Sequence, residues 1–276
     1  MADKWLFDYD TIQGEPHAVQ AANINPYLVD GPDVVVVKRS KPLCAVPEMV
    51  YGSKPTDGGH LLLSNQDREQ LLLVEPQAEP WIRPFLNADE FLNGVERWCL
   101  WLKDCPPQEL RRMPEVLKRV EAVRQMRVAS VKAATRGRAS LPMLFGEIRQ
   151  PGSEYLLAPA HTSENRRYIP MGYLPASVIC GNANLTIPDA TLYHFGVLQS
   201  TMHMAWMRAV AGRLKSDYRY SATIVYNTFP WPAPNAKQQN AIETAAQVLF
   251  DGRALFPEAR RVAFLFEQYQ KMLEQA

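Results

Sequence analysis

The stretch RAVAGRLKSDYRYSATIVYNTFPWP, residues 208–232, decides how this chain folds. Residues 191–214, which lead into it, place apolar side chains three and four positions apart, and this spacing predicts a helix with one buried stripe. The loop at residues 213–219 mixes hydrogen-bond donors, an acceptor and an aromatic ring, and residues 221–227 then alternate as a strand does. The two prolines of the FPWP motif at residues 229–232 exclude both a helix and a central strand. A central buried helix is therefore expected to present a polar loop.

The composition of the whole chain is that of an ordinary globular protein. Its 276 residues, 47% of them hydrophobic and 21% charged, suffice for one large or two small domains. The four cysteines form no CxxC pair and no histidine stands at metal-ligand spacing, so neither a zinc site nor a disulfide framework is expected. No apolar run approaches the roughly 20 residues of a membrane span, and the first residues do not resemble a signal peptide. We expect a cytoplasmic protein with no membrane partner.

The near-neutral net charge of +1 conceals a segregation of charge along the chain. Residues 1–110 carry 9 basic and 17 acidic side chains, net −8, whereas residues 111–234 carry 16 basic and 7 acidic ones, net +9. Residues 235–276 carry 5 of each sign. A polyanion would meet the basic middle region first. An equally good explanation is that the acidic and basic regions neutralise each other across an interface.

The longest predicted helix lies in the basic region and spans residues 108–138. Pro114 stands near its start, where the first turn tolerates proline. Between residues 111 and 138 there are nine basic side chains against two acidic ones, beside an apolar seam. A solvated basic face is one explanation, but we favour contact with phosphates because the excess is too large for ion pairs within the helix to satisfy. The predicted backbone contacts on this helix are Arg124, Arg127 and Lys132.

Residues 141–188 change character to short strand-like pieces separated by glycine and proline, which predicts a small sheet with long loops. The loop tips carry amide and guanidinium side chains, the types that contact base edges and phosphates. Asparagine is also an ordinary turn former, so a purely structural role stays open for these positions. The base-reading candidates are Asn165, Asn182 and Asn184, and the phosphate-binding candidates are Arg166 and Arg167.

The first third of the chain predicts short strands and helices. At the start, Trp5, Phe7 and Tyr9 alternate with polar residues in the pattern of a half-exposed edge strand. The VVVV run at residues 34–37 predicts a buried strand, because turn signals bound it on both sides.

Five further elements are expected before the basic region. A turn at residues 56–60 leads into a strand at 61–63, and a helix then begins at Ser64 and reaches about Glu75. A second short helix is expected around residues 81–91 and a strand at 97–102.

Beyond the FPWP motif, the chain predicts two antiparallel helices, each with one buried face. The first begins at Asn235 or Asn240 and reaches Phe250, and Gly252 breaks it. Pro257 then opens the second, which runs to the C-terminus.

Long blocks of this sequence resemble the part that follows the catalytic core in MmeI-like adenine methyltransferases, and the resemblance covers most of residues 5–232. In that family the segment is a target recognition domain, which reads a DNA sequence so that the methyltransferase can modify one adenine. The resemblance implies that specificity positions lie in the loop-bearing small sheet and in the loop at residues 213–219. The blocks are MVYGSKPTDGGHLLLS, WIRPFLNADEFLNGVERWCLWL, HTSENRRYIP, LYHFGVLQSTMHMAWMRAV and GRLKSDYRYSATIVYNTFPWP.

The catalytic core of such an enzyme is not evident in this sequence. Amino-methyltransferases hold the target amine with an Asn-Pro-Pro-aromatic loop, but the tripeptide Asn25-Pro26-Tyr27 lacks one proline and is better explained as a turn. No glycine-rich cofactor loop precedes it, and no nucleophile elbow, Walker loop or zinc signature occurs. We therefore expect no catalytic residue here, and we expect S-adenosylmethionine to bind in the associated catalytic domain.

Lys215 and Asp217 are the strongest base-reading candidates. In the predicted strand entry they stand two apart and project on one side. Lysine donates and aspartate accepts, which suits the major-groove edge of a G·C pair. The family resemblance implies a variable charged pair at this place, whereas the plain alternative is a surface ion pair. Arg213 and Arg219 beside them would position the DNA backbone.

The patterns together predict an α+β fold with mixed small sheets, a long basic helix, a central buried helix and a C-terminal helical hairpin. Residues 1–234 are expected to form the recognition domain, with an acidic part up to residue 110, and residues 235–276 a helical segment. The expected function is sequence-specific recognition of double-stranded DNA for an adenine-N6 methyltransferase whose catalytic domain is a partner in cis or in trans. The alternative is a regulatory subunit that binds a methyltransferase without reading DNA.

Overall fold

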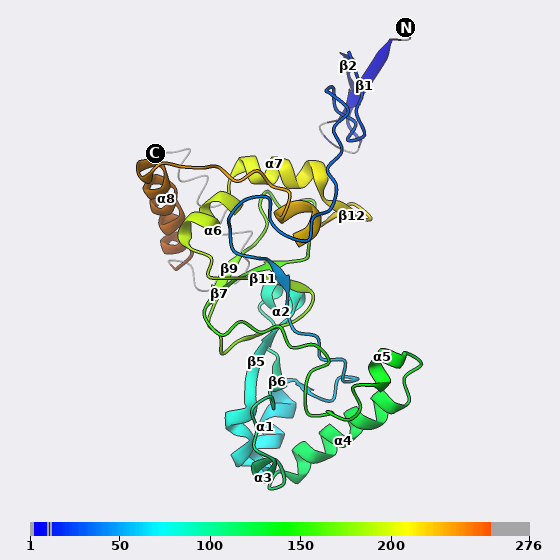
Figure 1. Cartoon of the computed structure of the whole chain (residues 1–276), viewed down its shortest axis with the longest axis vertical. Helices are drawn as coiled ribbons and strands as arrows, with labels where there is room; N and C mark the ends of the chain where they lie inside the picture. Colours follow the sequence, from blue (N-terminus) through cyan, green and yellow to red (C-terminus); the bar gives the residue numbers. More distant parts are fainter. Residues whose placement is uncertain (1–2, 10, 12, 255–276) are drawn as a thin grey trace.

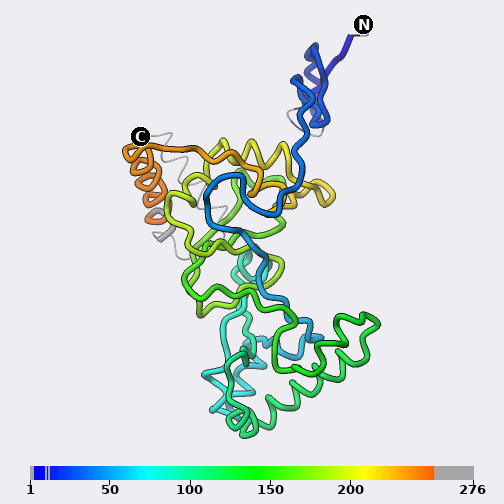
Figure 2. The backbone as a smooth tube through the Cα atoms, viewed as in Figure 1, coloured from blue at the N-terminus to red at the C-terminus, as the bar shows by residue number. Residues whose placement is uncertain are grey.

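The protein is elongated, with a two-stranded ribbon above two lobes that have separate hydrophobic cores (Figure 1). The computed structural model describes residues 3–9, 11 and 13–254. The chain passes through the upper lobe, enters the lower lobe after β3 (Val50–Tyr51) and returns at β7 (Tyr155–Pro159), as Figure 2 shows. The lower lobe is therefore built mainly from the segment between β3 and β7, and a short strand that follows β7 in the sequence, β10, completes its sheet.

The lower lobe packs helices against a four-stranded sheet. The strand order is β10-β5-β6-β4, with β10 parallel to β5 and the other neighbours antiparallel. The core includes Leu61, Phe85, Leu100, Val116 and Val123, none more than 2% exposed. The strands are β4 (Leu62–Leu63), β5 (Ile82–Leu86), β6 (Trp98–Leu100) and β10 (Ile179–Cys180), and the helices are α1 (Asn65–Val74), the 3-10 helix η1 (Pro76–Trp81), α3 (Pro107–Leu110), α4 (Pro114–Val128) and α5 (Ala133–Arg136). A further helix, α2 (Ala88–Asn93), lies below the upper sheet, where its Phe91 packs with Tyr155 and Leu157 of β7 (Figure 1).

The upper lobe is built on an antiparallel sheet of order β3-β11-β7-β9, covered by helices. Phe195, Met204, Tyr220 and Val225 lie in its core. The remaining elements are β9 (Gly172–Leu174), β11 (Asn184–Pro188), α6 (Leu192–Leu198), α7 (Thr201–Val210), the π-helical turn η2 (Ala222–Tyr226) and α8 (Ala236–Ala254).

Two small sheets complete the fold. A three-stranded antiparallel sheet of order β12-β13-β8 stands at the edge of the upper lobe. The N-terminal ribbon pairs β1 with β2 and projects from the top of the molecule (Figure 1). The strands are β1 (Lys4–Asp8), β2 (His17–Ala21), β8 (His161–Thr162), β12 (Gly212–Leu214) and β13 (Asp217–Arg219).

The two lobes are joined by close backbone contacts. Ser53 N donates to Cys180 O at 2.7 Å, and the side chain of Asn184 donates from Nδ2 to Leu86 O at 3.0 Å. A Cβ atom on Gly52 would lie only 2.4 Å from the carbonyl oxygen of Gly181, so glycine is required for this approach. The lower lobe is therefore held to the upper sheet at several points.

The predicted α+β class with mixed small sheets is confirmed, and several local predictions hold. β1 forms as the alternating pattern indicated, and Asn25 opens a turn, since its Oδ1 accepts from Tyr27 N at 2.9 Å. Ser64 caps α1 in a capping box with Asp67, as the spacing of these residues indicated. The FPWP segment at residues 229–232 is neither helix nor strand.

The prediction of one basic helix over residues 108–138 is wrong, because three helices occupy this range. Met113 adopts φ −119° and ψ 75°, which lies outside the helical region. A residue that precedes proline avoids the helical region because it would clash with the proline ring. Pro114 therefore begins a new helix, α4, which ends at Val128. The predicted helix at 81–91 is also wrong, because β5 occupies residues 82–86 and α2 begins only at Ala88.

The central helix and the strand after it also differ from the prediction. Ser200 Oγ accepts from His203 N and starts a second helix, so α6 and α7 replace one helix over residues 191–214. Residues 221–227 form a helical turn instead of a strand, because Ser221 caps it and Asn227 N donates to Ala222 O at 2.8 Å. The buried positions of this turn recur at helical spacing, a pattern that also passes for strand alternation over so short a run.

Two further predictions are wrong: the buried strand at residues 34–37 and the helix break at Gly252. The valines at 34–37 form no strand, and three of them are at least 58% exposed. α8 continues through Gly252, which does not interrupt it. The second helix of the predicted C-terminal hairpin lies outside the described residues.

Candidate nucleic-acid interface

The loop at residues 163–167 and the β12–β13 hairpin lie side by side because β13 pairs with β8, the strand that leads into the loop. The register places Arg219 opposite His161 and Tyr218 opposite Thr162. Beyond the last strand pair, Asp217 Oδ1 accepts from Glu164 N at 3.1 Å. This bond ties the tip of the hairpin to the start of the loop, so the two segments form one surface.

The hairpin carries charged side chains on both of its faces. Residues directly opposite each other on antiparallel strands share a face, so Arg213 lies with Tyr218. The Arg213 guanidinium stacks 3.7 Å from the centre of the Tyr218 ring, and its Nη1 donates to Ser216 O at 2.8 Å. Asp217 and Arg219 are exposed on the other face, because successive side chains of a strand alternate.

Lys215 does not stand in a strand entry, as the sequence had indicated, but in the hairpin turn. Its φ of +57° places it in the left-handed region, which few residues other than glycine adopt. Asp217 is the first residue of β13. The strand argument for a shared side of Lys215 and Asp217 is therefore wrong, although both residues are exposed near the tip of the same hairpin.

The loop at residues 163–167 is held by its own contacts. Asn165 N donates to Ser163 Oγ at 3.3 Å, and Arg166 Nη1 donates to Thr162 Oγ1 at 3.4 Å. The guanidinium of Arg167 lies 5.7 Å from the centre of the Tyr168 ring. Arg208, at the end of α7, donates to the carbonyl oxygen of Arg167 at 2.9 Å.

The structure thus gathers most of the predicted contact residues of the second half of the chain. Sequence reasoning missed two members of this surface, Arg208 and His161. Arg208 was placed inside a helix that was expected to run past it, and His161 directly precedes the loop without any motif around it. The predicted residues that lie together are Asn165, Arg166, Arg167, Arg213, Lys215, Asp217 and Arg219.

Arg127 cannot contact phosphate, and this prediction is wrong. The side chain is 1% exposed, and its guanidinium donates to five backbone carbonyl oxygens at 2.7–3.2 Å. A guanidinium has five N–H donors, so none remains for a ligand. Burial lowers the pKa of Arg127, but such a group stays charged at any ordinary pH. The carbonyl groups belong to Pro55, Thr56, Arg138, Leu141 and Leu144.

Asn184 is a second predicted contact that the structure excludes. It is fully buried in β11, and its side chain bonds across the joint between the lobes to Leu86 O. A residue in this place holds the two sheets together and cannot reach a base. Asn182 lies at the turn before β11 and is partly exposed, and its neighbours Gly181 and Ala183 bond to Leu86 O and Asn87 Oδ1.

The remaining basic candidates of the lower lobe differ in their surroundings. Arg124 is exposed and forms two hydrogen bonds of 2.7 Å with Glu121 one turn away. Lys132 precedes α5 and is exposed. Figure 1 shows α5 and β12 on the same side of the molecule, one on each lobe. That side therefore presents basic residues at two separate places.

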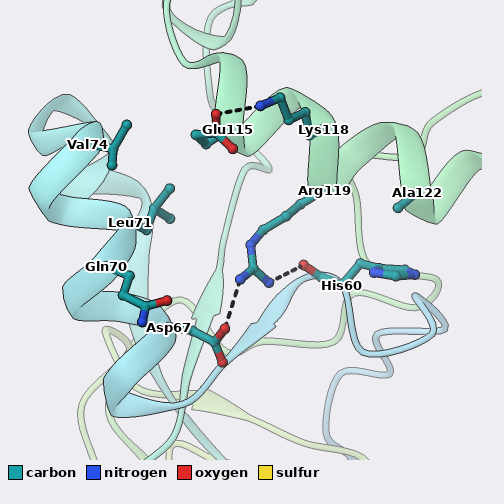
Figure 3. Close-up of a pocket in the computed structure, with 9 residues that line it drawn as sticks. All are labelled: His60, Asp67, Gln70, Leu71, Val74, Glu115, Lys118, Arg119 and Ala122. Atoms are coloured by element: carbon teal, nitrogen blue, oxygen red, sulfur yellow. Dashed lines mark hydrogen bonds and ion pairs between the residues drawn. The ribbon is translucent and has the colours of Figure 1, made fainter.

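A pocket of about 560 Å³ lies between α1, which belongs to the acidic region of the sequence, and α4, which belongs to the basic region (Figure 3). Across it, Arg119 donates to Asp67 Oδ1 at 3.0 Å and to His60 O at 3.3 Å. Hydrogen bonds from Ser64, followed by those from Arg119, hold the pKa of Asp67 below its usual value. Lys118 pairs with Glu115 at 2.6 Å on the same helix. Ion pairs within the protein thus satisfy more of the α4 charge than the sequence had indicated.

Neither a metal-binding cluster nor a membrane-spanning helix was found among the described residues. Over residues 3–9, 11 and 13–254, no cluster of three or more histidine, cysteine, aspartate or glutamate side chains could hold a metal ion. Within the same part of the chain, no helix has both the length and the apolar character to cross a membrane.

The fold and the surface together define a class of protein. Paired loops that carry arginine, lysine and amide side chains, fixed on a small sheet, are the arrangement of a domain that reads nucleic acid. More particularly, the chain belongs to the family described as MmeI, target recognition domain, whose model matches residues 30–233.

Two relatives support this assignment. DNA methyltransferase A of Bacillus subtilis (strain 168) is 38% identical over 232 residues, which are 84% of this chain and 26% of that protein. The solved structure of the type IIL restriction-modification enzyme MmeI in complex with DNA is 43% identical and superposes with a TM-score of 0.88. The match covers 99% of this chain and 42% of that chain. The chain thus spans about a quarter of the first relative and less than half of the second.

Proposed function

We propose that this chain reads a sequence of double-stranded DNA on behalf of an adenine-N6 methyltransferase. The observation that carries the proposal is the surface formed by the β12–β13 hairpin and the loop at residues 163–167, in a chain that belongs to a family of target recognition domains. The alternative of a regulatory subunit that does not read DNA is not favoured, because such a subunit has no use for this surface.

The catalytic domain is proposed to be a partner, in cis or in trans, and S-adenosylmethionine to bind there. No Asn-Pro-Pro-aromatic loop and no glycine-rich cofactor loop precedes the recognition segment in the sequence. All four cysteines are free thiols, in keeping with the reducing cytoplasm as the proposed place of action. Residues 1–234 are the proposed recognition domain, and residues 235–276, of which α8 is described, the proposed C-terminal segment.

Lys215 and Asp217 are proposed to read one base pair from the tip of the hairpin. Lysine donates to guanine O6 and N7 and aspartate accepts from cytosine N4, so the couple suits a G·C pair. Asp217 keeps free acceptor sites beside the bond to Glu164 N, because a carboxylate has about four lone-pair directions. Asn165 and Asn182 stay proposed base contacts. The proposed backbone contacts are Arg124, Lys132, Arg166, Arg167, Arg213 and Arg219.

The test is an exchange of the charged couple in a methyltransferase that carries this domain. The double substitution Lys215→Glu with Asp217→Arg should change the base accepted at one position of the site, since each wrong base costs roughly 1–3 kcal/mol. Methylated positions mapped by sequencing give the new site. An unchanged recognition site would remove Lys215 and Asp217 from the reading surface.

A further inference from the structure

A groove of about 890 Å³ lies between the turn of the N-terminal ribbon and the hairpin surface. Three segments far apart in the sequence line it, and the ribbon turn had no predicted role in contacting DNA. In Figure 1 the ribbon of β1 and β2 lies above β12. The lining side chains are Tyr9, Thr11 and Gln13 from the turn, Glu164 and Asn165 from the loop, and Arg213 and Tyr218 from the hairpin.

One wall of this groove is fixed before any ligand binds. The Arg213 guanidinium is held between the Tyr218 ring at 3.7 Å and Ser216 O at 2.8 Å. The bond from Glu164 N to Asp217 sets the loop against the hairpin. A donor that is already oriented loses less side-chain entropy when it binds.

The other wall is formed by Tyr9, Thr11 and Gln13, which lie between the paired strands β1 and β2. β1 and β2 pair from Lys4 opposite Ala21 to Asp8 opposite His17. The turn is closed by a bond of 2.9 Å from Gly14 N to Thr11 O. Thr11 and Gln13 are exposed. Their polar groups are therefore available to a molecule in the groove.

The chemistry of the lining suits base edges better than phosphates. The amides of Gln13 and Asn165 each offer a donor and an acceptor, the combination that pairs with adenine N6 and N7 in the major groove. Arg213 is the proposed backbone contact at the edge of this groove, whereas Glu164 beside the amides is an acceptor that would repel a phosphate. A groove that took the DNA backbone would have no use for that carboxylate.

We propose that the β1–β2 turn is a second reading element, in which Gln13 contacts a base pair that Asn165 contacts from the opposite wall. This pair is adjacent to the one proposed for Lys215 and Asp217, and adenine is the favoured base. The inference rests on the proposed function, because it requires that the hairpin surface contacts duplex DNA.

The experiment selects preferred duplexes from a randomised pool with the full chain, and measures affinity for them over a salt series. Gln13→Ala should reduce the preference at a single position by roughly 5- to 100-fold, the range of a good side-chain contact to a base. Asn165→Ala should affect the same position. Gln20→Ala is the matched control, since Gln20 is exposed on β2 of the same ribbon and does not line the groove.

Three results would overturn the inference. Equal weakening for all sequences after Gln13→Ala would mean that the groove takes the phosphate backbone. Selective binding that is unchanged by Gln13→Ala would mean that the turn does not contact DNA, and would leave the proposed function intact. A wild-type chain that binds no duplex would contradict both this inference and the proposed function.

Discussion

At the scale of single residues, Arg127 illustrates how a guanidinium that suits phosphate can instead organise a protein chain. Its five donors reach carbonyl groups from two segments, residues 55–56 and 138–144. These segments flank the start of β4 and the end of α5, so the side chain connects parts of the lower lobe that share no sheet. Nothing in the local sequence distinguishes it from Arg124, one turn earlier on the same helix.

Replacement of Arg127 by methionine should therefore destabilise the fold severely. The substitution keeps the apolar stem but leaves Thr56 O and Leu144 O without the donor that they have in the wild type, and each buried group left unpaired costs about 1–3 kcal/mol. The carbonyl groups of Pro55, Arg138 and Leu141 lose the guanidinium but keep a backbone N–H donor. We expect a loss of more than about 3 kcal/mol in the free energy of unfolding, measured by urea titration. Arg124→Met, at an exposed site on the same helix, should leave it nearly unchanged. Similar values for the two variants would contradict the structural role of Arg127.

His203 provides a second residue-scale prediction, because burial lowers its pKa to about 3. The ring is fully buried and pairs with the Tyr220 hydroxyl at 2.9 Å. In the unfolded chain the pKa is about 6.5, so between these values the unfolded state binds the proton and the folded state does not. Stability should thus fall as pH drops below 6.5, by up to about 1.4 kcal/mol per pH unit.

His203→Gln keeps a polar side chain at this position but removes the titrating group. Its unfolding free energy, followed by urea titration from pH 7 to pH 4, should fall less steeply than that of the wild-type chain. The carboxylates titrate in both proteins at the acid end, so the difference between the two profiles isolates the histidine. Parallel profiles would show that the protonation of His203 is not coupled to unfolding.

At the scale of elements, local sequence signals predicted where some helices begin and end. Tertiary contacts determined the features that the sequence did not predict. The Ser64 capping box and the break before Pro114 are written in a few neighbouring residues. The β12–β13 hairpin was missed because its turn has Lys215 at positive φ, where glycine or asparagine is the usual signal. The same holds for the site: the family blocks contain the loops that are proposed to read DNA, but the burial of Asn184 depends on contacts between segments that are distant in sequence.

The exposed basic residues on the two lobes lead to a prediction for the elements that carry them. Each phosphate contact adds about −0.9 to the slope of log affinity against log salt concentration. Single substitutions Lys132→Gln, before α5, and Arg219→Gln, on β13, should each make the slope shallower by about that amount without changing base preference. Arg112→Gln is the control, since Arg112 is exposed at the other end of α4. Nonspecific duplex binding between 50 and 200 mM salt provides the measurement.

The salt experiment separates two uses of the basic region. A slope that changes with Arg219 but not with Lys132 would restrict the DNA interface to the upper lobe. The α5 end of the lower lobe would then have to face protein. A slope that changes with Arg112 as well would show a diffuse electrostatic attraction with no defined surface.

At the scale of the whole molecule, the N-terminal ribbon is the part that the rest of the described chain covers least. Trp5 is 48% exposed, Phe7 58% and Val19 56%, and exposed valines continue along the segment that follows. A two-stranded ribbon is marginally stable by itself, and large exposed apolar patches are uncommon on monomers. Since this chain spans 26% of one relative and 42% of another, we expect the ribbon to pack against the catalytic domain that we propose as its partner.

The exposed apolar side chains of the ribbon should affect how the isolated chain behaves in solution. We expect it to bind a hydrophobic dye such as ANS and to self-associate at rising concentration, as measured by sedimentation velocity. The double substitution Trp5→Ser with Phe7→Ser should reduce both effects, because these two side chains share one face of β1. Leu73→Ser, at a residue 84% exposed on α1 of the lower lobe, is the control and should leave the self-association as it was. If the double variant associates as the wild type does, the ribbon is not the adhesive surface, and the partner domain must be sought on another face.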